Sequence, residues 1–198
     1  VGSEMCIRDR WKESPCYRNW RLIDRKADMV PNSTNLRAFD KVSVVGLGYI
    51  GLPTAAFIAS KGIPVVGIDV NQDAVDSINA GKVPFFEPSF GELLARVVNE
   101  GTLPAQTEQI EANAYIVCVP TPFREDHSVD TKYIRAAAEA LAPHLKPGAL
   151  VVLESTSPPG TTEDMAKHLV ELRPDLSLND EDDNAIFIAH CPCLLYTS

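Results

Sequence analysis

Three glycines, Gly46, Gly48 and Gly51, form a G-x-G-x-x-G turn that follows the apolar run 42–45 and leads into a segment with a helical pattern. In this context the spacing is typical of a turn that binds the pyrophosphate of a dinucleotide. Gly46 permits the tight turn, Gly48 lets the phosphates approach the backbone, and Gly51 allows the helix to pack close to the sheet. The alternative is a glycine-rich structural turn that binds nothing.

Asp69 indicates which dinucleotide this turn would bind. It ends a second apolar run, 63–68, and lies eighteen positions after Gly51. A carboxylate at this place accepts hydrogen bonds from a ribose 2′-hydroxyl and repels a 2′-phosphate. Because no Arg or Lys follows before Lys82, the sequence predicts NAD rather than NADP. The phosphates would lie at a helix N-terminus, where unpaired N–H groups and the helix dipole favour negative charge.

Two rigid loops rich in hydroxyl groups follow later apolar runs. The first reads V-P-T-P-F, and its two prolines stiffen the chain on either side of Thr121. The second reads E-S-T-S-P-P-G-T and leads into a helical segment. Loops of this kind often carry functional residues, so Thr121 and Thr156 are candidate site residues. Serine and threonine before a helix are also ordinary caps, and this role is expected for Thr161 or Thr162.

The elements that must position these residues indicate an α/β fold. From Lys41 onward, short β-branched runs alternate with longer amphipathic segments, which predicts a doubly wound parallel sheet of the Rossmann type in three layers. We expect strands at 42–46, 64–69, 115–119, 149–153 and 185–189, with a weak one at 103–106. We expect helices at 50–61, 72–80, 89–99, 131–142 and 161–172. The strand order 3-2-1-4-5-6 follows, and the loops after strands 1, 2, 4 and 5 should form the ligand site.

The charge balance excludes one class of partner. Of the 18 basic and 27 acidic residues, residues 1–37 hold eight and five, which leaves a net charge of −12 for residues 38–198. A surface this acidic argues against a nucleic-acid partner. The most acidic stretch, 179–184, is expected to be a solvated loop, and weak binding of a divalent ion is the alternative. No apolar run approaches the roughly 18 residues of a membrane span, and no signal peptide is evident, so we expect a cytoplasmic protein with no membrane partner.

The five cysteines indicate neither disulfides nor a metal site. They are scattered, with no C-x-x-C pair and no histidine at zinc spacing. A reducing compartment is therefore expected. Cys118 falls within the predicted strand 115–119, where a small buried apolar residue is expected rather than a nucleophile.

The residues at the two ends of the chain are expected to lie outside the folded domain. Residues 1–10 and 193–198 resemble translated sequencing adapters. We therefore expect 1–37 to be a non-native or disordered N-terminal segment, 38–192 to be the NAD-binding domain, and 193–198 to be a non-native tail. Met29 is a plausible true start. The alternative is a genuine disordered N-terminal extension.

Taken in order, the glycine turn, the V-P-T-P loop and the E-S-T-S-P-P-G loop resemble the UDP-glucose/GDP-mannose dehydrogenase family. The similarity covers about residues 41–192. That is most of the family's N-terminal cofactor domain and none of its central helix or C-terminal sugar-binding domain. Within the family, the segments VGLGYIGLPTAAF, GIDVNQDAVDSIN and GALVVLESTSPPGTTE are most similar to the branch that acts on UDP-N-acetyl-D-mannosamine.

The resemblance implies roles for particular residues. It implies that Tyr49, Ile50 and Asp69 bind NAD, and that Thr121 and Thr156 lie beside the nicotinamide. Thr156 would also hold the catalytic water. Many relatives carry Arg or Lys five residues after the ribose aspartate. That position is Ala74 here, which removes one adenosine contact and fits the mannosamine branch.

The implied reaction is a double oxidation in bacterial surface polysaccharide synthesis. A sugar C6 alcohol is oxidised to the aldehyde and then, through a cysteine thiohemiacetal and thioester, to the carboxylate, with two NAD and one water. The family's nucleophilic cysteine, lysine and aspartate lie beyond this chain. The chain is therefore expected to bind NAD without turnover.

The implied partners also depend on the missing part of the family's architecture. The UDP-sugar would bind through the C-terminal domain, and the full-length protein would be a homodimer formed through the central helix. UDP-glucose and GDP-mannose remain alternative substrates, because the residues that select the sugar lie mostly downstream. A second alternative is an NAD-binding regulatory domain that has no chemistry of its own.

Overall fold

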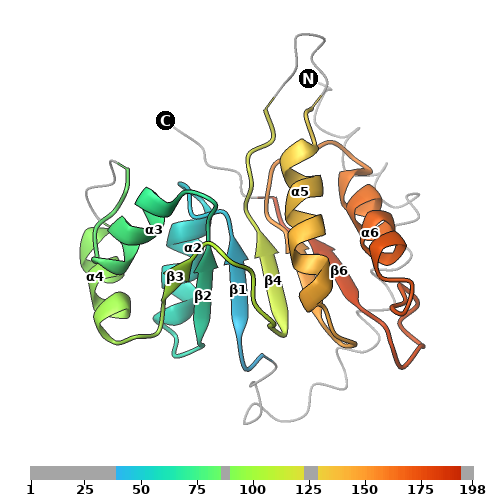
Figure 1. Cartoon of the computed structure of the whole chain (residues 1–198), viewed down its shortest axis with the longest axis horizontal. Helices are drawn as coiled ribbons and strands as arrows, with labels where there is room; N and C mark the ends of the chain where they lie inside the picture. Colours follow the sequence, from blue (N-terminus) through green and yellow to red (C-terminus); the bar gives the residue numbers. More distant parts are fainter. Residues whose placement is uncertain (1–38, 86–89, 123–128, 193–198) are drawn as a thin grey trace, which may run out of the picture. The chain divides into compact units, whose positions relative to one another are not determined.

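Six parallel strands form one sheet in the order β3-β2-β1-β4-β5-β6 in the computed structural model, which describes residues 39–85, 90–122 and 129–192 (Figure 1). The strands are β1 (Val42–Val45), β2 (Val65–Ile68), β3 (Ala105–Gln106), β4 (Ala114–Val117), β5 (Leu150–Leu153) and β6 (Phe187–His190). Every neighbouring pair is parallel. The predicted doubly wound sheet and its strand order are confirmed.

Except between β3 and β4, successive strands are connected through helices. The helices are α2 (Gly51–Ala59), α3 (Gln72–Asn79), α4 (Gly91–Asn99), α5 (Lys132–Leu141), the short 3-10 helix η3 (Ala142–His144) and α6 (Thr161–Leu172). All strand and α-helix bounds lie within two residues of those predicted. None of the helices in the described ranges is long and apolar enough to cross a bilayer. The predictions for residues 1–37 and 193–198 concern segments outside the described residues.

Side chains from the central strands enter two hydrophobic clusters on opposite faces of the sheet. Val44 and Ile116 belong to the cluster that includes residues of α2, α3 and α4. Tyr115 and Val117 belong to the cluster formed with α5 and α6. Successive residues of a strand point to opposite faces. The sheet is therefore covered by helices on both faces, as a parallel sheet requires, and the three-layer arrangement is confirmed.

Helix α6 begins differently from the cap that the sequence suggested. Its N-cap is Gly160, which has a φ of +94°, and no side chain makes a capping hydrogen bond there. Thr161 is already the first helical residue and is buried, with its N–H donating to the carbonyl of Pro158 at 3.2 Å. The prediction that Thr161 or Thr162 caps the helix is wrong, because the turn places at the cap a left-handed conformation that glycine adopts most readily.

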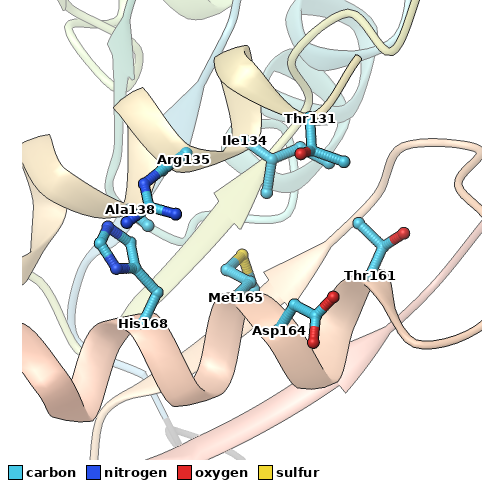
Figure 2. Close-up of a pocket in the computed structure, with 8 residues that line it drawn as sticks. All are labelled: Thr131, Ile134, Arg135, Ala138, Thr161, Asp164, Met165 and His168. Carbon is cyan, nitrogen blue, oxygen red and sulfur yellow. The ribbon is translucent and has the colours of Figure 1, made fainter. Parts of the chain in front are cut away.

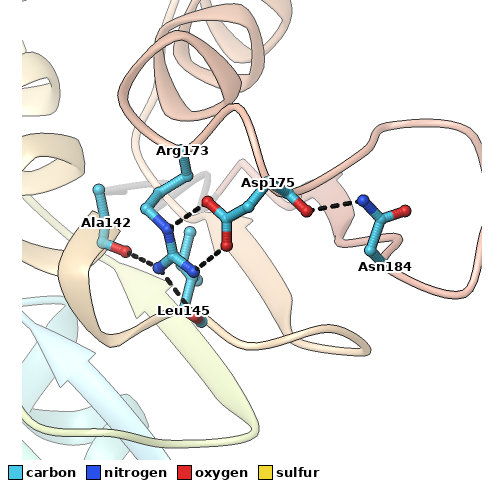
Figure 3. Close-up of polar contacts among 5 residues, drawn as sticks. All are labelled: Ala142, Leu145, Arg173, Asp175 and Asn184. Carbon is cyan, nitrogen blue, oxygen red and sulfur yellow. Dashed lines mark hydrogen bonds and ion pairs between the residues drawn. The ribbon is translucent and has the colours of Figure 1, made fainter.

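Arg173, which follows α6, joins the end of that helix to the segment after α5 (Figure 3). Its Nη1 donates hydrogen bonds to the carbonyl oxygens of Ala142 and Leu145, at 2.7 and 2.9 Å. Its Nε and Nη2 donate to the two carboxylate oxygens of Asp175, at 2.8 and 2.7 Å. These hydrogen bonds hold the pKa of Asp175 below its ordinary value. The pair is therefore intact at neutral pH and loses its contribution to stability only as the pH falls through that lowered pKa.

Replacing Arg173 with methionine is expected to lower the free energy of unfolding by about 1–2 kcal/mol, because two backbone carbonyls lose their donor. In a domain of this size the corresponding decrease in Tm is about 3–6 °C. Thermal unfolding followed by circular dichroism measures this change. Lys167→Met removes an exposed cation from α6 and serves as the control. Equal Tm values for the two variants would contradict the role given to Arg173.

Candidate cofactor site

The glycine turn follows β1 at the carboxyl edge of the sheet, and each of its three glycines has a different environment. Gly46 has a φ of +91°, and a Cβ there would lie 2.6 Å from the carbonyl oxygen of Cys118. A Cβ on Gly51 would overlap the carbonyl oxygen of Gly46 and lie 3.0 Å from Cys118 Cβ. A Cβ on Gly48 would meet nothing within 4 Å. Two glycines therefore close the turn, and Gly48 leaves open space at its surface.

The N-terminus of α2 is available to an anion. Ile50 occupies the N-cap position, and its side chain makes no capping hydrogen bond. The first turn of the helix also carries no acidic side chain. Helix α3 differs, because the side chain of Asn71 accepts hydrogen bonds from the backbone N–H groups of Asp73 and Ala74. The first turn of α2 thus leaves N–H groups without a side-chain cap next to the open face of Gly48, where a phosphate is favoured.

Asp69, which follows β2, is hydrogen-bonded to the glycine turn. Its Oδ2 accepts a hydrogen bond from the backbone N–H of Leu47 at 2.8 Å. Its Oδ1 accepts one from the backbone N–H of Asn71 at 2.9 Å. Each carboxylate oxygen has a further lone pair for another donor. Asp69 therefore holds the turn after β1 against the loop after β2 and keeps capacity for the hydroxyls of a ribose.

Tyr49 lies on the outer side of the turn. Its side chain is largely exposed, and its ring packs on that of Phe85 with the centroids 4.3 Å apart and the planes at 34°. Phe85 in turn packs against the hydrophobic cluster of α2, α3 and α4. The aromatic contact holds the exposed ring of Tyr49 against Phe85.

Two hydroxyl groups form hydrogen bonds between the loops that follow β4 and β5. The hydroxyl of Thr121 donates to the carbonyl oxygen of Thr156 at 2.7 Å. The hydroxyl of Ser155 donates to the carbonyl oxygen of Val119, also at 2.7 Å. The two candidate threonines therefore lie together at the carboxyl edge, with Thr121 half-buried and the side chain of Thr156 exposed. Sequence reasoning missed Ser155, which is buried and makes the second link.

Sequence reasoning also missed Glu154. Its side chain links the segment after β5 to α2 and to the segment after β4. Its Oε1 accepts a hydrogen bond from the hydroxyl of Thr54 in α2 at 3.2 Å, and its Oε2 accepts one from Cys118 Sγ at 3.4 Å. Strand β4 ends at Val117, so the prediction of Cys118 as a strand-interior residue is wrong. The thiol is half-buried behind the glycine turn. The one available sequence signal was that Glu154 is the first polar residue after an apolar strand.

A pocket between α5 and α6 is lined by other residues (Figure 2). It is lined by side chains of both helices and their first turns, including Arg135, Asp164, Met165 and His168. Its volume is about 70 Å³, well below the roughly 300 Å³ at which small-molecule sites begin. This pocket is too small for a nicotinamide nucleotide. Among the residues that the structure describes, no group of three His, Cys, Asp or Glu side chains could hold a metal ion.

A model of the NAD binding domain of the UDP-glucose/GDP-mannose dehydrogenase family matches residues 40–197. The chain belongs to this family. The resemblance drawn from the three motifs is confirmed, and NAD is confirmed as the cofactor of the domain.

Curated relatives from this family are about half identical to the chain. The UDP-N-acetyl-D-mannosamine dehydrogenase of Salmonella typhi is 50% identical over 157 residues, which cover 78% of this chain and 37% of the relative. The enzyme of the same name from Campylobacter jejuni is 53% identical over 160 residues, covering 79% and 39%. The chain therefore spans less than two fifths of the length of these relatives.

Solved structures of the dehydrogenase family share the fold. The UDP-N-acetyl-mannosamine dehydrogenase of Staphylococcus aureus superposes with a TM-score of 0.72 at 34% identity, over 79% of this chain and 37% of that one. A GDP-mannose dehydrogenase from Pseudomonas aeruginosa gives a TM-score of 0.71 at 26% identity, over 78% and 36%.

The described residues fit the cofactor of this dehydrogenase family. The open face of Gly48 and the uncapped first turn of α2 suit a pyrophosphate. Asp69 suits a ribose diol, since both oxygens are fixed by backbone N–H groups. The linked loops with Thr121 and Thr156 lie on the other side of the switch point between β1 and β4. In a doubly wound sheet the two halves of a dinucleotide bind across that point.

Proposed function

We propose that the chain is the cofactor-binding part of an enzyme that oxidises the C6 hydroxyl of a UDP-sugar to the carboxylate. The observation that carries the cofactor part of the proposal is the hydrogen bond from Leu47 to Asp69, which holds the carboxylate assigned to the ribose against the turn assigned to the phosphates. UDP-N-acetyl-D-mannosamine is the substrate we favour, because curated relatives that are about half identical carry that name. A role in bacterial surface polysaccharide synthesis follows from such a product.

The adenosine and pyrophosphate half of NAD is assigned to the turn after β1 and to Asp69. The backbone N–H groups of Tyr49 and Ile50, which lie just before the first turn of α2, would donate to the phosphate oxygens. Gly46 and Gly51 shape the turn, and Gly48 lets the phosphates approach it. Asp69 would accept hydrogen bonds from the ribose hydroxyls.

The nicotinamide half is assigned to the loops that contain Thr121 and Thr156. The hydrogen bond between Thr121 and the Thr156 carbonyl keeps the two loops at a fixed separation, so that the ring is oriented towards the sugar. The exposed hydroxyl of Thr156 is free to hold the water that hydrolyses the covalent intermediate. NAD supplies the hydride acceptor when it is bound. The chain's own residues bind it and orient it.

The remaining functions belong to the part of the relatives that this chain does not span. The nucleophilic cysteine, the sugar-binding surface and a homodimer contact are assigned to that part, and the enzyme to the cytoplasm. In a protein extended through its downstream reading frame, kcat/KM should be higher for UDP-N-acetyl-D-mannosamine than for UDP-glucose or GDP-mannose. The reverse order would contradict the substrate that we favour.

The cofactor assignment is tested by titrating the purified chain with NADH and NADPH and following the fluorescence of each cofactor. We expect NADH to bind at least about tenfold more tightly, because a 2′-phosphate would lie against the Asp69 carboxylate. Adding UDP-N-acetyl-D-mannosamine together with NAD⁺ should produce no NADH. Equal affinity for the two cofactors would contradict the role of Asp69. Production of NADH would contradict the assignment of the catalytic residues to the part of the relatives that this chain does not span.

A further inference from the structure

Glu154 is a carboxylate to which no role in binding or chemistry has yet been given. It follows β5 at the carboxyl edge of the sheet, between the end of β4 and helix α2. Thr54 of α2 and Cys118 each donate a hydrogen bond to one of its two oxygens. The side chain is half-buried, so the carboxylate has a defined position.

The topology places Glu154 on the nicotinamide side of the site. The glycine turn follows β1, and Asp69 follows β2 on one side of it. The strand order reverses between β1 and β4, and a dinucleotide extends across that point. With the adenosine half on the side of β2, the nicotinamide half lies over β4 and β5. Glu154 follows β5 directly and contacts the glycine-turn helix through Thr54.

The charge of Glu154 has no basic partner in the described part of the chain. Its two hydrogen bonds come from a hydroxyl and a thiol, both of which are neutral donors. Asp130, in the segment before α5, differs because Lys132 Nζ lies 3.4 Å from its Oδ2. A carboxylate that is paired in this way exerts little net field, whereas no neighbouring cation offsets a negative charge on Glu154 in the described part of the chain.

We propose that Glu154 makes the domain bind NAD⁺ in preference to NADH through the charge of its carboxylate. The proposal rests on the proposed function, which places the nicotinamide over β4 and β5. The nicotinamide ring is positively charged in NAD⁺ and neutral in NADH, while the phosphates carry the same charge in both. A fixed negative charge near the ring therefore lowers the Kd of the oxidised form relative to that of the reduced form.

This preference has a consequence for the proposed reaction. Each sugar needs two oxidised cofactors in succession, so NADH must leave and NAD⁺ must enter before the second oxidation. A carboxylate that favours the charged ring assists this exchange. It also makes the bound cofactor a weaker oxidant, by about 30 mV for each tenfold difference in affinity of a two-electron couple.

The test compares the ratio of the Kd of NADH to the Kd of NAD⁺ in the purified chain and in two variants of Glu154. NADH binding is followed by cofactor fluorescence, and NAD⁺ binding by displacement of NADH. Glu154→Gln retains an acceptor for Thr54 and removes the charge. We expect it to lower the ratio by about tenfold. Glu154→Asp retains the charge and should keep most of the preference.

Glu100→Gln is the matched control. Glu100 is exposed at the end of α4, near Thr102, whose carbonyl accepts a hydrogen bond from Val65 at the start of β2. The same charge is thus removed at the amino edge of the sheet, away from the site. The Kd ratio of this variant should equal that of the unmodified chain.

The outcomes distinguish an effect of the Glu154 charge on the cofactor from a purely structural role of Glu154, and they also test the proposed function. If Glu154 only braces Thr54 and Cys118, Glu154→Gln will weaken both cofactors equally and leave the ratio unchanged, which would overturn the inference. If the chain binds neither NADH nor NAD⁺, the proposed function fails as well. Should Glu154→Gln not fold, the unmodified chain still provides a test, because the proposal requires it to bind NAD⁺ more tightly than NADH. A Kd for NADH equal to or lower than that for NAD⁺ would overturn the proposal.

Discussion

Replacing Gly51 with alanine is expected to lower the free energy of unfolding by about 3 kcal/mol or more, because an added methyl cannot fit without moving backbone. The new Cβ would overlap the carbonyl oxygen of Gly46 and press on Cys118 Cβ. Neither neighbour is the flexible end of a side chain, so relief requires α2 to move away from the turn after β1 and from the segment after β4. Thermal unfolding should show a Tm lower by about 6–12 °C, and NADH binding should be lost with the geometry of the turn.

Two other glycines provide controls for this result. Gly91 begins α4, and a Cβ there would meet nothing within 4 Å, so Gly91→Ala should leave the Tm unchanged or slightly higher. Gly48→Ala should also fold normally, since its Cβ would enter open space, but it should weaken NADH binding because that space is assigned to phosphate. A Gly51→Ala chain as stable as Gly91→Ala would contradict the steric argument.

The periodicity of the sequence was sufficient to predict the sheet and its helices. A parallel sheet is buried on both faces, so its central strands appear as short β-branched runs such as 42–45 and 150–153. Crossover rules then leave little freedom in strand order. The glycine turn and Asp69 also lie within one short segment, 46–69, so the sequence alone could indicate a candidate cofactor site there.

The contacts that join distant segments could not be predicted in this way. Thr54 and Glu154 are 100 positions apart, and no local pattern indicates that they form a hydrogen bond. The hydrogen bond from Thr121 to Thr156 likewise joins two loops that the sequence suggested only as neighbours. The sequence anticipated that Gly51 lets the helix pack close to the sheet, but it could not identify the atoms that a Cβ there would meet, the carbonyl oxygen of Gly46 and Cys118 Cβ.

Replacing Asp69 with asparagine is expected to weaken NADH binding by about tenfold to a hundredfold, since hydrogen bonds to a charged group contribute about 1.5–3 kcal/mol. The asparagine amide has one acceptor oxygen in place of two, so either Leu47 or Asn71 loses the acceptor of its N–H. The substitution therefore weakens the attachment of the glycine turn to the loop after β2 and also removes a hydrogen-bond acceptor for the ribose hydroxyls. Fluorescence titration of the chain with NADH measures the change in Kd.

The same substitution should also reduce the preference for NADH over NADPH. The carboxylate of Asp69 repels a 2′-phosphate, and a neutral amide of the same size does not. Affinity for NADPH should therefore fall less than affinity for NADH, and the ratio of the two Kd values should move towards one. Asp180→Asn, which neutralises an exposed carboxylate in the loop before β6, should change neither value. If Asp69→Asn weakens both cofactors equally, Asp69 anchors the turn through Leu47 without selecting the cofactor.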